Sequence, residues 1–296
     1  AGRKTGGNPY SRGLLALLSA AFHWMVFQSL GIAAPVALAL WAFWLDPRQL
    51  VTREIAMSPP CWLGPPLRIA LASDLHVGAP GVGVQKLDAL VARINAARPD
   101  LIVLLGDYVI QGVKGGQFVT PETIAHHLRP LNARLGVYAI LGNHDWWLDA
   151  TRVERAMASV GIRMLEDTSV DLGRPGEGFW LAGISDFWEG KHDVVAALSK
   201  VRDDRPVIAI THNPDVFPAI PPRVCLTLAG HTHGGQVSLP FIGPPIVPSV
   251  YGQRYAAGLV HESERHLFVT SGVGTSILPV RFRVPPELIV LTVRTN

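Results

Sequence analysis

Five short clusters in the sequence combine imidazole, carboxylate and amide side chains, which Mn, Fe and Zn accept together as ligands. They are Asp74-Leu75-His76, Gly106-Asp107, Gly142-Asn143-His144-Asp145, His212 and Gly230-His231-Thr232-His233. Each cluster alone also suits a turn or a helix cap. Together they supply enough ligands for two adjacent divalent ions, which can activate water and neutralise phosphate oxygens. The set therefore predicts metal-dependent hydrolysis of a phosphate ester, and we expect Asp107 to bridge the two ions.

Short apolar runs precede these clusters, at 67–72, 101–105, 137–141, 207–210 and 226–228. Their Ile, Val and Leu residues scarcely alternate with polar ones, which is typical of strands buried on both faces. Helical periodicity lies between several of them, over 84–97, 121–131 and 151–160. This alternation predicts an α/β fold with a largely parallel sheet. Each cluster then lies at the carboxyl end of a strand, where such sheets bind their ligands.

The composition limits the classes of partner. The chain has 296 residues, of which 48% are hydrophobic and 17% charged, with a formal charge of +3. This excess is too small to indicate nucleic acid, and it fits a weak preference for an anionic membrane surface. The only cysteines, Cys61 and Cys225, match no zinc motif and no disulfide framework. We expect both to be packing residues or free thiols.

Residues 13–45 carry no formal charge and are longer than the roughly 20 residues that span a bilayer. They predict a transmembrane segment, with a buried helix of a soluble core as the alternative. Trp24, Trp41 and Trp44 suit interfacial anchoring. Pro35 either kinks one long helix or separates two shorter ones, so the side of the membrane that carries the catalytic domain stays open.

As a set, the clusters resemble the calcineurin-like metallophosphoesterases, whose pattern is D-x-H, G-D, G-N-H-[DE], H and G-H-x-H. The resemblance covers about 67–292 and implies an α/β/β/α sandwich. Together with the uncharged segment, it divides the chain into a tail (1–12), the transmembrane segment (13–45), a linker with a first strand (46–66) and the metallophosphoesterase domain (67–296). It also implies two metal ions, first of all manganese, with iron or zinc as alternatives. The implied ligands are Asp74, His76, Asp107 and His233 for one ion, and Asp107, Asn143, His212 and His231 for the other.

The same resemblance assigns His144 to protonation of the leaving group and Asp145 to a hydrogen bond that orients His144. Some branches place an Arg soon after G-D, whereas Tyr108-Val109-Ile110-Gln111 follows here, which weakens a phosphoprotein-phosphatase assignment. The sequence is similar to a membrane-anchored bacterial branch that includes enzymes cleaving the pyrophosphate of UDP-2,3-diacylglucosamine in lipid A synthesis. This similarity predicts a location at the bacterial inner membrane.

Two side chains are candidates for direct substrate contact. Trp146, beside Trp147, is expected to line an entrance, and Arg281 to bind a second phosphate. The main hypothesis is hydrolysis of a phosphodiester or pyrophosphate bond, possibly in a lipid-linked substrate such as UDP-2,3-diacylglucosamine. The alternatives are a broad-specificity phosphomonoesterase, a cyclic-nucleotide phosphodiesterase, or a catalytically silent membrane scaffold. The expected partners are the phosphoester, including a glycolipid precursor, and membrane lipid, but no nucleic acid.

Overall fold

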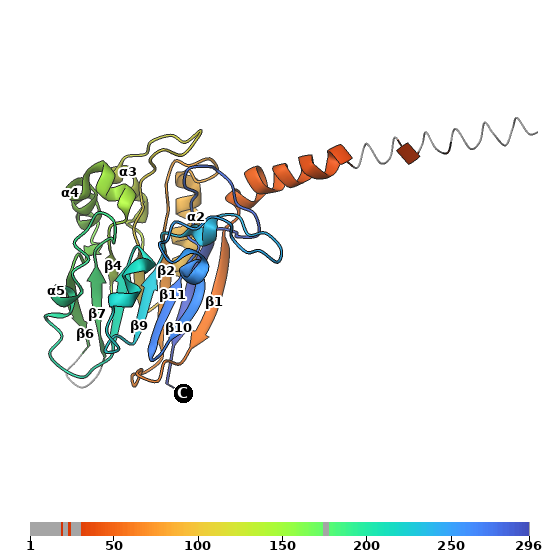
Figure 1. Ribbon diagram of the computed structural model, residues 1–296. Helices are drawn as coiled ribbons and strands as arrows, with labels where there is room; N and C mark the ends of the chain where they lie inside the picture. The colour runs from red at the N-terminus through yellow and green to blue at the C-terminus, as the bar shows by residue number, and fades with distance from the viewer. Residues whose placement is uncertain (1–18, 20–22, 25–30, 174–177, 296) are drawn as a thin grey trace, which may run out of the picture.

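The computed structural model describes residues 19, 23–24, 31–173 and 178–295. Within these residues two six-stranded sheets pack face to face, and helices cover their outer faces (Figure 1). One apolar core lies between the sheets, and one lies beneath the helices on each outer face. This arrangement confirms the predicted α/β/β/α sandwich.

The first sheet carries three of the five clusters. Its strands β2, β3, β4 and β5 are parallel, while β12 is antiparallel to β2 and parallel to β1. In spatial order they are β1 (Val51–Met57), β12 (Glu287–Val293), β2 (Leu67–Ala72), β3 (Leu101–Leu104), β4 (Val137–Ala139) and β5 (Arg163–Met164). The central strands are buried on both faces, as their unbroken apolar runs predict.

The second sheet carries the other two clusters. Strands β11, β9, β8 and β7 are parallel, and the antiparallel strands β10 and β6 close its two edges. In spatial order they are β10 (Gly258–Glu262), β11 (Arg265–Val269), β9 (Leu226–Ala229), β8 (Val207–Thr211), β7 (Phe179–Ile184) and β6 (Thr168–Leu172). The sequence predicted a single largely parallel sheet from the strand pattern, and the structure divides these strands between two.

The helices bury one apolar stripe each. On the outer face of the first sheet lie α2 (Val84–Ala96), α3 (Pro121–Leu128) and α4 (Asn143–Ser159), and α5 (Val194–Leu198) lies on the second. Shorter 3-10 turns are η3 (Pro214–Ala219), η4 (His233–Gly235) and η5 (Gly252–Tyr255). In α2, Leu87, Leu90, Val91 and Ile94 form the buried stripe, with the helical spacing that the sequence indicated.

The expectation of free cysteines is wrong, because Cys61 and Cys225 form a disulfide with their Cα atoms 5.6 Å apart. Cys61 lies between β1 and β2, and Cys225 directly precedes β9. The bond therefore joins the two sheets near the amino-terminal ends of β2 and β9. The partners are 164 positions apart in sequence, so their spacing carried no signal of the pairing.

The membrane predictions also need correction. Within the described residues, no helix combines the length and the apolar character needed to cross a bilayer. Most of 13–30, like the tail at 1–12, lies outside the described residues. Residues 31–40 form a helix that runs out from the sandwich and continues into η1 (Trp41–Leu45) and η2 (Asp46–Arg48) (Figure 1). This finding contradicts the predicted anchoring in the bacterial inner membrane, whereas the predicted transmembrane segment at 13–45 falls largely on residues outside those described.

Candidate metal centre

The carboxyl ends of five strands meet at one edge of the sandwich. Strands β2, β3 and β4 of the first sheet and β8 and β9 of the second end there. The structure brings together, as buried side chains, all of the predicted ligands: Asp74, His76, Asp107, Asn143, His212, His231 and His233. We call this set the metal centre.

Ligand atoms in the metal centre gather into two groups around one aspartate. In the first group, Nε2 of His233 lies 3.4 Å from Oδ1 of Asp74 and 3.2 Å from Nε2 of His76. In the second, Nε2 of His212 lies 3.2 Å from Nδ1 of His231. Oδ2 of Asp107 faces both groups, at 3.5 Å from His76 Nε2 and 3.3 Å from His212 Nε2. Asp107 therefore lies between the two groups of ligand atoms.

Two buried oxygens of the metal centre indicate that it is built for cations. Oδ1 of Asp74 and Oδ1 of Asn143 are buried and have no hydrogen-bond partner. An unmet buried acceptor costs about 1–3 kcal/mol, and a cation at that point removes the penalty. The mixture of imidazole nitrogens with carboxylate and amide oxygens fits divalent Mn, Fe or Zn.

Backbone strain is concentrated at the same residues. Non-glycine residues seldom adopt positive φ, and such strain persists where the surrounding structure enforces it, often at functional sites. Five of the predicted ligands have positive φ: Asp74 (54°), His76 (40°), Asp107 (55°), His231 (68°) and His233 (52°). The sharp turns after β2, β3 and β9 therefore aim these side chains at one point.

Backbone carbonyls and burial set the state of the imidazoles. Nδ1 of His76 donates to the Val109 carbonyl (3.2 Å) and Nδ1 of His212 to the Leu105 carbonyl (2.6 Å), so both rings turn Nε2 toward Asp107. Burial lowers the pKa of His76 to about 4. Its ring is therefore neutral at pH 7, the form that binds metals.

The aspartate between the two groups is held as an anion. Burial raises the pKa of Asp107, but the nearby imidazoles, His212 first, lower it by more, so the net pKa lies well below the usual value. For His212, burial lowers the pKa, and the Asp107 carboxylate raises it to well above the usual value. The Asp107 carboxylate is therefore ionised at pH 7, which is the form that binds a cation.

His144 and Asp145 begin α4, but they do not interact as predicted. The His144 ring lies against the rings of His76 (4.7 Å between centroids) and Trp147 (4.8 Å), and its Nδ1 has no partner among the described residues. Asp145 instead accepts backbone N–H groups at four residues: Asp107 (2.7 Å), Gly142 (2.9 Å), Tyr108 (3.0 Å) and Val109 (3.3 Å). Asp145 therefore fastens the turn after β3 to the turn after β4.

Trp146 and Arg281, the two predicted substrate contacts, lie outside the metal centre. Trp146 packs against the core beneath α4. Arg281 is 0% exposed, and its guanidinium donates to the carbonyls of His233 (3.1 Å), Ser271 (2.8 Å) and Gly274 and to Nδ1 of His233 (3.2 Å). Neither side chain lines the cavity that opens over the metal centre and is described next. Arg281 fixes the orientation of His233 from behind, so its burial corrects the predicted grip on a substrate phosphate.

A cavity of about 370 Å³ opens directly over the metal centre. Besides ligand residues, its lining includes His144, Trp147, Trp188, Gln111, Gln236, Ile246 and Ile277. Trp188 follows β7, and the sequence analysis did not single it out. No motif surrounds it, so no sequence signal distinguished it from the other tryptophans.

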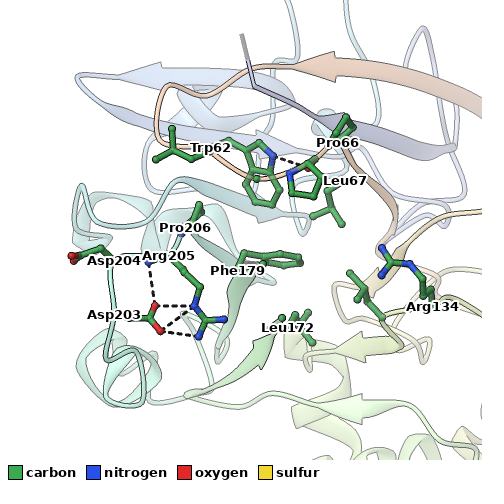
Figure 2. Close-up of a pocket in the computed structure, with 16 residues that line it drawn as sticks. Trp62, Pro66, Leu67, Arg134, Leu172, Phe179, Asp203, Asp204, Arg205 and Pro206 are labelled. Atoms are coloured by element: carbon green, nitrogen blue, oxygen red, sulfur yellow. Dashed lines mark hydrogen bonds and ion pairs between the residues drawn. The ribbon is translucent and has the colours of Figure 1, made fainter. Parts of the chain in front are cut away.

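A larger cavity of about 990 Å³ lies at the opposite end of the strands (Figure 2). Its walls include Leu67 at the start of β2, Phe179 at the start of β7, and Trp62, whose indole Nε1 donates to the Pro65 carbonyl at 3.1 Å. Arg205 and Asp203 pair at its rim. It contains none of the predicted functional residues.

Fold and site together define a class: a hydrolase of phosphate esters that holds divalent metals between the ends of two sheets. The profile of the calcineurin-like phosphoesterases matches residues 67–235. The chain belongs to this family and is a metallophosphoesterase.

Several bacterial relatives share most of the chain. The metallophosphoesterase YkuE of Bacillus subtilis is 32% identical over 86% of this chain and 90% of its own length. The phosphodiesterase YaeI of Escherichia coli is 31% identical over 76% and 82%. The UDP-2,3-diacylglucosamine pyrophosphatase LpxG of Chlamydia trachomatis is 27% identical over 87% and 93%.

Solved structures are more distant. A putative 5′-nucleotidase from Staphylococcus aureus matches 71% of this chain with 9% identity and a TM-score of 0.45. The chain spans about half the length of that structure, with 49% of it covered.

Proposed function

We propose that this chain hydrolyses a phosphodiester or pyrophosphate bond with two divalent metal ions, manganese, iron or zinc. The observation that carries the proposal is the position of Asp107, whose Oδ2 faces one group of ligand atoms on each side. In this proposal Asp74, His76, Asp107 and His233 hold one ion. Asp107, Asn143, His212 and His231 hold the other. Its relatives YaeI and LpxG are named as a phosphodiesterase and a pyrophosphatase.

Two bound ions supply Lewis-acid chemistry, which activates water and neutralises phosphate oxygens. The chain supplies the geometry for that chemistry. Asp145 holds the turns that present Asp107 and Asn143, and the carbonyls of Leu105 and Val109 orient His212 and His76. His144 stands beside the centre, free of hydrogen bonds at Nδ1 within the described residues, and delivers a proton to the leaving group.

We also propose that the substrate has an apolar part. The loop after η4 exposes Phe241, Ile242 and Ile246, and Ile246 reaches the cavity lining. Exposed apolar side chains in a loop that reaches a cavity favour an apolar ligand. A lipid-linked phosphoester such as UDP-2,3-diacylglucosamine, the substrate in the name of LpxG, has this character.

The test compares Asp107→Asn and His144→Gln with the wild type on bis-p-nitrophenyl phosphate, p-nitrophenyl phosphate and UDP-2,3-diacylglucosamine. Asp107→Asn is expected to lose turnover and bound metal together, and His144→Gln to lose about a hundredfold or more in kcat with both ions retained. Asp88→Asn is the matched control, since Asp88 lies on α2 and pairs with His127. Full activity in Asp107→Asn contradicts the dinuclear assignment, and faster monoester turnover favours a phosphomonoesterase.

A further inference from the structure

Two tryptophans stand over the metal centre as one wall of its cavity, which we call the aromatic wall. Trp147 lies on α4 with its ring centroid 4.8 Å from that of His144. Trp188 lies in the loop after β7, perpendicular to the His231 ring at 4.4 Å. They remain 48% and 43% exposed, so each indole has surface free for a ligand.

Hydrogen bonds hold the aromatic wall in place across the two sheets. Nε1 of Trp147 donates to Oε1 of Glu189 at 2.7 Å. The backbone N–H groups of Trp188 and Glu189 donate to Oδ2 of the buried Asp186, at 2.8 and 3.0 Å. Because α4 follows the first sheet and Asp186 follows β7 of the second, these bonds fix both indoles relative to the metal centre. The wall is therefore preorganised, which favours stacking of a flat or apolar group.

The cavity lacks groups that bind a second phosphate. Among the described residues that line it, none is a lysine or an arginine. Its polar lining outside the metal centre includes the neutral amides of Gln111 and Gln236. The guanidinium of Arg281 is buried behind His233 and donates to carbonyl oxygens and a ring nitrogen. A departing phosphate group carries negative charge that proteins usually meet with Arg or Lys.

We propose that the leaving group is an uncharged aromatic or apolar alcohol that stacks on the aromatic wall, so that the chain cleaves phosphodiesters in preference to pyrophosphates. This rests on the proposed function, because it takes the metal centre as the place of hydrolysis. It narrows that function to its phosphodiester alternative, so that a pyrophosphate such as UDP-2,3-diacylglucosamine is the poorer substrate. The His144 ring contacts the Trp147 indole. If His144 protonates the leaving oxygen, the group attached to that oxygen therefore lies against the indole. The substrate class is thus a phosphodiester with an aryl, nucleoside or other apolar alcohol on the leaving side.

The reaction consumes one water. Its oxygen forms a new bond to phosphorus, and the bond from phosphorus to the leaving oxygen breaks with its electron pair. One proton of the water passes to the leaving oxygen by way of His144, and the second is released from the new phosphate group. The products are a phosphomonoester and a neutral alcohol, which needs no cation in the cavity.

The first experiment measures kcat/KM of the metal-loaded wild type for bis-p-nitrophenyl phosphate and for ADP-ribose. ADP-ribose offers an aromatic base but releases a phosphate-bearing leaving group. We expect the diester to react about a hundredfold faster or more. Equal or faster cleavage of ADP-ribose overturns the preference while the proposed function stands. If the protein hydrolyses neither compound, the proposed function itself is wrong.

The second experiment tests the aromatic wall by binding, without turnover. Calorimetry on the metal-loaded protein compares diphenylphosphinate with dimethylphosphinate, which carry the same charge and have no ester bond to hydrolyse. The diphenyl compound is expected to bind the wild type at least about tenfold tighter, which is the effect expected for one stacked ring. The Trp147→Ala and Trp188→Ala variants are expected to lose this difference in affinity. Trp147→Phe keeps a ring without the bond to Glu189 and should retain most of it. Trp180→Ala, which removes an indole at the far end of β7, is the matched control.

The third experiment adds the missing charge. Ile246→Lys places an ammonium at the cavity lining and is expected to raise the ADP-ribose to diester ratio of kcat/KM about fivefold or more. Val195→Lys adds the same charge at an 82% exposed position on α5 and should leave the ratio unchanged. An unchanged ratio in Ile246→Lys, or an intact diphenyl advantage in both tryptophan variants, contradicts the proposal. Melting temperatures of all variants identify any that fail to fold.

Discussion

Replacing Asp145 with asparagine tests which of two roles this residue has. The structure indicates that it fastens the turns after β3 and β4, whereas the sequence predicted that it orients His144. The carboxylate accepts two backbone N–H groups on each oxygen, from Asp107 and Gly142 on Oδ2 and from Tyr108 and Val109 on Oδ1. Asparagine keeps one oxygen and turns an NH2 group toward the remaining two N–H donors. The variant therefore loses two buried hydrogen bonds at the junction of β3 and α4.

The expected loss of stability follows from those two bonds. Each buried donor left without an acceptor costs about 1–3 kcal/mol, so the free energy of unfolding should fall by about 2–6 kcal/mol. Burial raises the pKa of Asp145 to about 7, and the measurement therefore belongs at pH 8.5, where the carboxylate is ionised. A domain with ordinary stability survives a loss toward the lower end of this range.

Three measurements distinguish the roles: urea unfolding of the metal-free protein, metal content after dialysis, and the pH dependence of kcat/KM. If Asp145 fastens the turns, Asp145→Asn loses stability and bound metal, since Asp107 and Asn143 both shift. Asp149→Asn is the control, because Asp149 lies at the kink within α4, is exposed and accepts one backbone N–H. Wild-type unfolding and metal content with a displaced pH profile would refute this reasoning and restore the predicted pairing with His144.

Three further predictions concern other parts of the fold. Cys61→Ser or reduction of the bond to Cys225 should lower the free energy of unfolding by up to about 5 kcal/mol for a closed loop of 164 residues, and thermal melts with and without reductant measure it. Arg281→Gln should reduce metal content from two ions toward one, because His233 loses its fixed orientation, and Arg281→Lys should recover part of it in equilibrium dialysis. Burial lowers the pKa of Lys86 from 10.5 to about 7, so the unfolded chain binds one more proton between these values. The free energy of unfolding, relative to Lys86→Met, should therefore rise with pH from 7 to 10 in urea titrations, and a constant difference contradicts it.

The sequence located the metal centre because each cluster directly follows a buried strand. Asp74 and Asp107 lie just beyond β2 and β3, which are neighbours in one parallel sheet, so their proximity could be predicted from the strand pattern. His212 and His231 follow β8 and β9, which lie in the other sheet. Apolar runs buried on both faces look alike in either sheet, so only the family resemblance predicted that two sheets meet.

The roles of individual side chains were harder to predict, because they depend on the direction in which each side chain points. Successive residues of a helix point about 100° apart, so of Trp146 and Trp147 one faces the core and the other the cavity. The sequence favoured Trp146, and the structure turns Trp147 to the cavity. His144 and Asp145 diverge for the same reason, and the acceptor role of Asp145 depends on backbone N–H groups that no sequence pattern displays.

The position of Arg281 links these observations to selectivity. As a surface cation it would neutralise a second phosphate, but it is buried with its donors directed at carbonyl oxygens and His233. The positive charge that meets the substrate would then come from cations held by the metal centre, where they would neutralise the oxygens of the phosphate under attack. On the leaving side the substrate meets Trp147, Trp188 and neutral amides. The choice between substrates therefore depends on apolar contact with the leaving group. A charged leaving group would lose its hydration in the cavity and would find no opposite charge to replace it.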